Sequence, residues 1–156
     1  MVEIPDTESL GNVGYERVYV ELDWYDGPRA GLADVDGVAH YFRAVHDHAR
    51  PDAPDDEYVV WPVSESVLAL EREQWAIFAD WDTRRTAGCA DSASHPGNGG
   101  IDARYDELEV RLAPLRHPPA HARRVTAQWR SIPGPRYHAE GVDCLVKWRS
   151  AADGHR

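Results

Sequence analysis

The sequence predicts one α+β domain, in which an antiparallel sheet of five or six strands carries two helices packed on one face. Alternating apolar residues and a tight turn indicate strands in residues 15–45. An amphipathic helical pattern follows in residues 64–85, and two alternating runs lie near the C-terminus. We expect the domain to span residues 15–150, with a loose arm at 1–14 and a short tail at 151–156.

The first predicted strand lies in residues 17–24, where side chains alternate between two faces. One face holds Val18, Val20, Leu22 and Trp24, and the other holds Arg17, Tyr19, Glu21 and Asp23. Gly27 and Pro28 end this strand, because proline lacks a backbone donor and restricts the residue before it. A short fourth strand is predicted at residues 58–61, after an acidic, proline-bearing loop at residues 46–57.

Asp36 and Gly37 join the second and third strands, near residues 30–35 and 38–44, in a predicted β-hairpin. Both residues accept the positive φ angles of a type I′ turn. A two-residue turn sets the register: Val35 with Val38, Asp34 with Ala39, Ala33 with His40, Leu32 with Tyr41, Gly31 with Phe42, and Ala30 with Arg43. The small residues opposite Phe42 indicate that its ring lies across them, and the same face directs His40 toward the core.

Ser64 is the predicted N-cap of a helix that runs to about Arg85. Its apolar side chains fill one broad arc: Val67, Leu70, Trp75, Ile77, Phe78 and Trp81. Three polar side chains project from inside that arc: Glu71, Gln74 and Asp82. A buried carboxylate is costly unless it is paired, so these residues need partners or a water-filled pocket.

Residues 86–100 are small, polar and glycine-rich, and form the longest flexible segment that we predict. A second helix follows, with Asp102 as its cap, and continues until Pro114 disrupts it. Two strands close the chain, at residues 122–131 and 142–149. Their core-facing positions are Val125, Ala127 and Trp129 in the first, and Val142, Cys144, Val146 and Trp148 in the second.

Composition bounds the class of protein. An apolar fraction of 42% and six tryptophans predict a packed globule. The chain shows no signal-peptide pattern, and no apolar run approaches the ~20 residues that cross a bilayer. Two cysteines are too few for a disulfide framework. We therefore expect a soluble cytoplasmic protein that does not contact a membrane.

Charge is unevenly distributed along the chain. The net charge is −10, but residues 111–156 carry nine basic and three acidic residues. The acidic total argues against wrapping nucleic acid, which needs a basic surface. The basic last third allows a local anion site. Alternatively, its strands neutralise acidic strands within one sheet.

The stretch Asp23-Trp24-Tyr25-Asp26-Gly27-Pro28, followed by the Asp-Gly hairpin, resembles short bacterial proteins of uncharacterised function that carry a similar hairpin. The resemblance extends to the His95-Pro96 loop, the helix start at residues 104–108 and the final Val-Lys-Trp strand. It implies no activity, cofactor or site residue.

Four groups of residues are candidates for binding or chemistry. The first group is at a strand end, where loops commonly hold polar ligands: Asp23, Tyr25, Asp26 and Arg29. Turn chemistry and a surface ion pair also explain these residues.

The second group is Glu71, Gln74 and Asp82, which indicate a cleft between helix and sheet, with a carboxylate as acid or base. The structural alternatives are that arginines such as Arg29 or Arg43 pair with them, or that they sit at the rim.

Histidines form the third group. His40 and His95 are candidate acid–base residues, His95 because it can lie over a cleft from the glycine-rich segment. His46 and His48 have a spacing that can ligate zinc, but we expect them to face water and predict no metal site. Cys89 lies in the same segment as His95 and carries no sign of activation.

The fourth group is the basic face of the last two strands: Arg124, Arg130, Lys147 and Arg149. This face could meet a phosphate or an acidic partner. Trp129 and Trp148 alternate onto the opposite face, which argues against a stacking platform for nucleic acid.

Three hypotheses about function follow. The first is a binding or regulatory module that contacts a protein partner or a small-molecule ligand. The second is a small acid–base enzyme with its cleft between the 64–85 helix and the sheet. The third is an anion or nucleic-acid binder that acts through the C-terminal strands. No cofactor can be assigned from the sequence.

Overall fold

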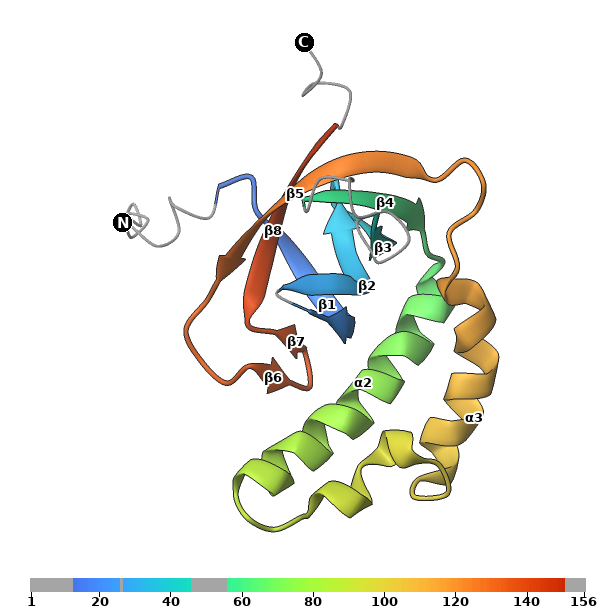
Figure 1. The fold of residues 1–156 in the computed structure, drawn as a ribbon, viewed down its shortest axis with the longest axis vertical. Coiled ribbons are helices and arrows are strands. Elements are labelled where there is room, and N and C mark those ends of the chain that lie inside the picture. The colour runs from blue at the N-terminus through green and yellow to red at the C-terminus, as the bar shows by residue number, and fades with distance from the viewer. Residues whose placement is uncertain (1–12, 26, 46–55, 151–156) are drawn as a thin grey trace, which may run out of the picture.

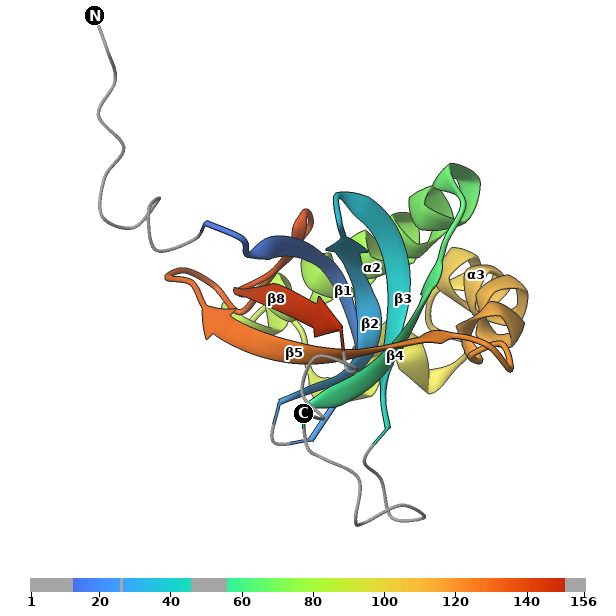
Figure 2. The same ribbon diagram turned by 90° about the horizontal axis from the view of Figure 1, so that it is seen from above.

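Six antiparallel strands close into a barrel (Figures 1 and 2). The computed structural model describes residues 13–25, 27–45 and 56–150. The strands, in their order around the barrel, are β1 (Glu16–Trp24), β2 (Pro28–Val35), β3 (Val38–Ala44), β4 (Glu57–Pro62), β5 (Arg123–Ser131) and β8 (Cys144–Ser150). With two helices on its outside, this architecture confirms the predicted α+β class. Closure comes from β8, which pairs with both β5 and β1.

The β2–β3 hairpin has the register predicted from its turn at all six pairs. Asp36 and Gly37 have φ angles of 54° and 78°, as a type I′ turn requires. A Cβ atom added to Gly31 would lie 2.8 Å from the Phe42 ring and 2.1 Å from the Val20 carbonyl oxygen. Glycine at this position therefore lets the Phe42 ring lie directly against the strand.

Aromatic rings fill the inside of the barrel. Phe42, Tyr58, Trp129 and Trp148 lie within 5.4–5.9 Å of one another, centroid to centroid. Tyr58 also donates a hydrogen bond to the Pro28 carbonyl oxygen at 2.6 Å, and Trp129 Nε1 donates to the Tyr58 hydroxyl at 3.1 Å. The prediction that both tryptophans belong to the core is confirmed.

Two helices lie side by side outside the barrel (Figure 1). Helix α2 covers Glu65–Thr86, and Ser64 caps it by accepting from the Val67 backbone N–H. Helix α3 covers Ala103–Leu112 and is capped by Asp102, after which the chain turns into the 3₁₀ helix η3 (Ala113–Arg116). Both predicted caps are confirmed, and the α-helix ends before Pro114, as expected.

The segment between the helices, predicted to be flexible, contains two 3₁₀ turns, η1 (Ser92–Ser94) and η2 (Pro96–Asn98). It packs against α2, where Trp81 Nε1 donates to Ser94 Oγ at 2.9 Å.

A small hairpin of β6 (Tyr137–His138) and β7 (Gly141–Val142) lies in the connection before β8. Val142 therefore belongs to this hairpin, although we predicted it as the first residue of the last strand.

Strand β1 departs from the predicted alternation. Its pairing with β2 shifts register between Val18 and Val20, between Glu21 and Asp23, and between Asp23 and Trp24. Such bulges redirect side chains. Val18 and Val20 are buried as predicted, but Trp24 is 46% exposed and does not reach the core.

None of the helices in the described ranges is both long and apolar enough to cross a membrane.

Candidate functional site: a cleft beneath helix α2

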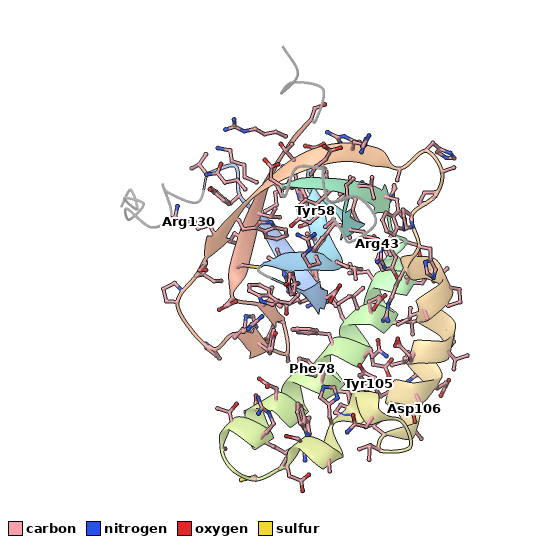
Figure 3. The ribbon with its side chains drawn as sticks, viewed as in Figure 1. Arg43, Tyr58, Phe78, Tyr105, Asp106 and Arg130 are labelled. Atoms are coloured by element: carbon pink, nitrogen blue, oxygen red, sulfur yellow. The ribbon has the colours of Figure 1, made fainter. Side chains whose placement is uncertain are left out.

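A cleft of about 330 Å³ lies outside the barrel, between α2, the end of β1, α3 and the β6 hairpin. Its lining residues are Val20, Glu21, Leu22, Asp23, Trp24, Glu71, Gln74, Trp75, Phe78, His95, Tyr105, Glu109, Arg116 and Tyr137. In Figure 3, Tyr58 lies within the barrel, whereas Phe78 and Tyr105 lie beside α2 and outside the barrel. The size is at the lower end of the range for small-molecule pockets.

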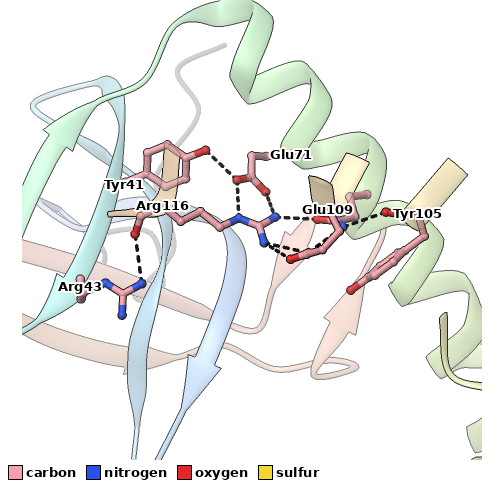
Figure 4. A network of polar contacts seen from close by, with 7 residues as sticks. Tyr41, Arg43, Glu71, Tyr105, Glu109 and Arg116 are labelled. Carbon is pink, nitrogen blue, oxygen red and sulfur yellow. Dashed lines mark hydrogen bonds and ion pairs between the residues drawn. The ribbon is translucent and has the colours of Figure 1, made fainter. Parts of the chain in front are cut away.

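Arg116 is the centre of the polar wall (Figure 4). Its Nε donates to Glu71 Oε2 at 2.9 Å, and its Nη2 donates to Glu71 Oε1 at 2.7 Å and to Gln74 Oε1 at 2.6 Å. Its Nη1 donates to both carboxylate oxygens of Glu109, at 2.7 and 3.1 Å. All three nitrogens of the guanidinium therefore donate hydrogen bonds within the protein.

Glu71 is the most buried member of this cluster, at 1% exposure. Besides Arg116, it accepts a hydrogen bond from the Tyr41 hydroxyl at 2.7 Å. Burial and this bond to a carboxylate raise the pKa of Tyr41. The sequence allows an arginine partner for Glu71, with Arg29 and Arg43 as examples, and the arginine found there is Arg116. Arg43 instead donates to the backbone oxygen of Arg116 at 3.0 Å, and so braces the residue that makes the pair.

The cluster keeps a negative balance despite its ion pairs. Glu71 and Glu109 share one guanidinium, and the Glu109 side chain is 45% exposed. Burial opposes the charge on Arg116, but the hydrogen bonds and charge of Glu71 and the charge of Glu109 outweigh it and raise the pKa of the guanidinium. Gln74 completes the arrangement, since its Nε2 donates to Glu109 Oε2 and to the Tyr105 backbone oxygen, both at 3.3 Å.

Glu21 stands apart from this cluster and also lines the cleft. Its side chain is 8% exposed, and it accepts from the Tyr137 hydroxyl at 2.7 Å and from Arg136 Nη2 at 3.4 Å. Burial raises the pKa of this carboxyl, although Tyr137 and Arg136 pull it down. Sequence reasoning missed Glu21 as a site residue, because its partner Tyr137 lies 116 positions away in the chain and no local pattern indicates their contact.

Aromatic rings form the rest of the lining. The rings of Trp75, Phe78 and Tyr137 lie 5.3–5.4 Å from one another. Trp75 Nε1 donates to the His138 backbone oxygen at 2.8 Å, which holds the indole in place. At the rim, the Arg136 guanidinium lies 4.2 Å from the centre of the Trp24 ring. The cleft thus combines fixed ring surfaces with carboxylates.

Comparisons with known proteins add no family. No protein-family model, curated protein or solved structure matches this chain.

Several predicted site residues do meet at the cleft. Glu71, Gln74, His95 and Asp23 all line it. The His95 ring packs 4.4 Å from the Trp81 ring, and its Nδ1 accepts the Gly97 backbone N–H at 2.8 Å. This contact orients the imidazole. The predicted pocket on the covered side of α2 is thus present.

Other predicted site residues lie elsewhere. Asp82 is partly exposed, is not part of the lining, and pairs with Arg85 at 3.6 Å. His40 lies on the same face of β3 as Phe42 but is only partly buried, because it lies near the turn. Its Nδ1 is 2.7 Å from the Val38 backbone oxygen. Tyr25 is 71% exposed, and Arg29 is partly buried in β2.

Some predictions fall on residues that are not described. Asp26, the His46 and His48 pair, the tail at 151–156 and most of the N-terminal arm lie outside the described residues. Within residues 13–25, 27–45 and 56–150, no group of three or more His, Cys, Asp or Glu side chains is arranged to hold a metal ion. Cys89 is exposed, whereas Cys144 is buried and burial raises its pKa to about 12.

The basic C-terminal residues are partly engaged by acids and by a tyrosine. Arg124 Nε lies 2.8 Å from Glu57 Oε1, between neighbouring strands. Arg130 and Lys147 both approach the Tyr15 ring, at 5.9 and 5.7 Å, and Arg149 is exposed. The Arg124–Glu57 pair is a contact of the kind that neutralisation within the sheet predicts.

Proposed function

We propose that this protein is a small-ligand binding module, and that the cleft beneath α2 is its binding site. The observation that carries this proposal is the saturation of the polar wall. Every nitrogen of the Arg116 guanidinium donates within the protein, and Gln74 and Glu71 are engaged within the same cluster. Such a wall keeps the shape of the cleft, while the aromatic rings offer surface for a ligand.

The test uses 2-phenylethanol, a neutral aromatic probe that fits a cleft of this size. The six tryptophans give six indole N–H signals in a ¹H–¹⁵N NMR spectrum. We expect Trp75 and Trp24, which line the cleft, to shift on titration, whereas Trp129 and Trp148 inside the barrel stay unchanged. Uniform small shifts at all six indoles, or no shifts with this probe and with charged analogues of the same body, would refute a site in the cleft.

Neighbouring aromatic residues provide a matched pair of variants for the same titration. Trp24 lines the cleft at 46% exposure, and Tyr25 follows it in the chain at 71% exposure without lining the cleft. Trp24→Ala should weaken binding of the probe severalfold, and Tyr25→Ala should leave it unchanged. Equal effects of the two substitutions would place the probe outside the cleft.

A second candidate function is acid–base catalysis in the same cleft. Glu21 favours it, because burial raises the pKa of this carboxyl while Glu71 and Glu109 stay paired to Arg116. Glu21 would then serve as the proton donor, and the ionised carboxylates of Glu71 and Glu109 would stabilise positive charge in the transition state. Hydrolysis of 4-nitrophenyl esters or glycosides by the wild type, lost in Glu21→Gln and kept in Glu107→Gln, would support it. Absence of turnover would exclude hydrolysis of these substrates.

A further inference from the structure

We infer that the cleft selects an organic cation, a primary or alkylated ammonium attached to a small apolar body. This inference rests on the proposed binding function and names the class of ligand for the same site. Three features of the cleft carry it: the charge of its lining, the saturation of Arg116, and the aromatic walls.

The lining has an excess of negative charge. It contains four carboxylates, from Glu21, Asp23, Glu71 and Glu109, against the single guanidinium of Arg116. Arg136 adds one positive charge next to the lining, since it contacts Glu21 and Trp24. With these carboxyls ionised the balance stays negative, so a cation entering the cleft gains electrostatic energy in a partly water-excluded space.

An anionic ligand at Arg116 would compete with partners that the guanidinium already has within the protein. A carboxylate or phosphate is usually held by a bidentate arginine. Here each nitrogen of the guanidinium already donates to Glu71, Gln74 or Glu109. An anion would have to compete with these partners, and displacing Glu71 would leave a buried carboxylate without its counter-charge, which is strongly unfavourable.

The aromatic walls favour a cation over a neutral group of equal size. Trp75, Phe78 and Tyr137 lie at mutual angles of 51–86°, so the cluster offers both edges and faces to a ligand. The negative face of an aromatic ring attracts a positive charge within about 6 Å. Arg136 already uses the Trp24 ring in this way, at 4.2 Å, at the rim of the cleft.

The experiment compares three probes with one phenethyl-type body and different head groups: 2-phenylethylamine, 2-phenylethanol and 3-phenylpropanoate. Affinities are measured by calorimetry at neutral pH, and the Trp75 indole signal reports whether each probe occupies the cleft. We expect the amine to bind about tenfold tighter than the alcohol or better, a difference of about 1.4 kcal/mol. The carboxylate should bind more weakly than the alcohol.

A pair of variants tests whether the cleft carboxylates cause this preference. Glu109→Gln removes a charge from the lining, whereas Glu107→Gln removes one from the same helix outside the lining. We expect Glu109→Gln to reduce the ratio of amine to alcohol affinity severalfold, and Glu107→Gln to leave it unchanged. Equal reductions by both variants would overturn the inference, because they indicate only the overall charge of the protein.

The outcomes separate this inference from the function beneath it. If the alcohol shifts Trp75 and the carboxylate binds as well as the amine, the cleft binds ligands but cation selection is wrong. If none of the three probes shifts Trp75, the binding function itself fails, and the inference fails with it.

Discussion

Arg116 and Glu71 face each other as a bidentate ion pair, with Nε 2.9 Å from Oε2 and Nη2 2.7 Å from Oε1. The two residues lie 45 positions apart in the chain and join η3 to α2. The Glu71 side chain is fully buried and that of Arg116 is 12% exposed. The pair therefore ties η3, which carries Arg116, to α2, the helix that covers the barrel.

Removal of the guanidinium should destabilise the fold strongly. Arg116→Met leaves Glu71 buried and uncompensated, so we expect a loss of about 3–5 kcal/mol in the free energy of unfolding. Measured by urea denaturation, Glu71→Gln combined with Arg116→Met should be less destabilised than the sum of the two single variants. Simple additivity would show that the pair does not act as a unit.

The Tyr41 hydroxyl provides a smaller test of the same wall. Tyr41→Phe removes a buried hydrogen bond to a charged acceptor, and we expect a loss of about 1.5–3 kcal/mol by urea denaturation. Tyr25→Phe is the matched control, because Tyr25 is 71% exposed and its substitution should change stability by less than about 0.5 kcal/mol. Similar values for both variants would contradict the role of the Tyr41–Glu71 bond.

The pH dependence of stability should carry the signature of Glu21. Burial raises its pKa in the folded state, so the folded protein binds this proton more tightly than the unfolded chain. Its contribution is full below the unfolded pKa and is lost as pH rises through the folded pKa. The groups that bear on it are Tyr137, Arg136 and Asp143.

The stability of Glu21→Gln relative to the wild type should therefore increase as pH rises from about 4 to 7, around the ordinary glutamate pKa. Thermal or urea denaturation at matched pH values measures this difference. A difference that stays constant across the range, or changes in the opposite direction, would show that the Glu21 pKa is not raised.

Gly31 should tolerate no side chain. A Cβ there would lie 2.1 Å from the Val20 carbonyl oxygen, which is backbone and cannot move aside freely, and 2.8 Å from the Phe42 ring. We expect Gly31→Ala to cost about 1–3 kcal/mol or more. Val38→Ala in the same hairpin, at 55% exposure, should cost less than about 0.5 kcal/mol. An unchanged urea midpoint for Gly31→Ala would contradict the close packing of this strand.

Local patterns predicted much of the fold. The hairpin register followed from Asp36 and Gly37, because a two-residue turn allows only one pairing of its strands. The start of α2 followed from its cap at Ser64, and the burial of Glu71 and Gln74 followed from helical geometry. Each of these features depends on residues close together in the chain.

The parts that could not be predicted depend on long-range packing. Arg116 meets Glu71 only because a 3₁₀ turn after α3 directs it toward α2, and no local pattern specifies that direction. Glu21 joins the cleft through Tyr137, which lies 116 positions further along the chain, and no alternation pattern specifies that contact. Closure of the barrel rests on the pairing of β1 with β8, in which Glu16 pairs with Val146 and Arg17 with Leu145. These two strands lie at opposite ends of the domain in the sequence.

Strands β4 and β5 are hydrogen-bonded neighbours, yet the whole helical part of the chain lies between them in sequence. The chain leaves the barrel after Pro62 and returns at Arg123, beside the strand that it left. The order of the strands therefore does not depend on the length of the helical segment between Pro62 and Arg123. Evolution or protein engineering can vary the segment between these two strands without changing strand order, provided that α2 still covers the barrel and keeps Trp75 in the core.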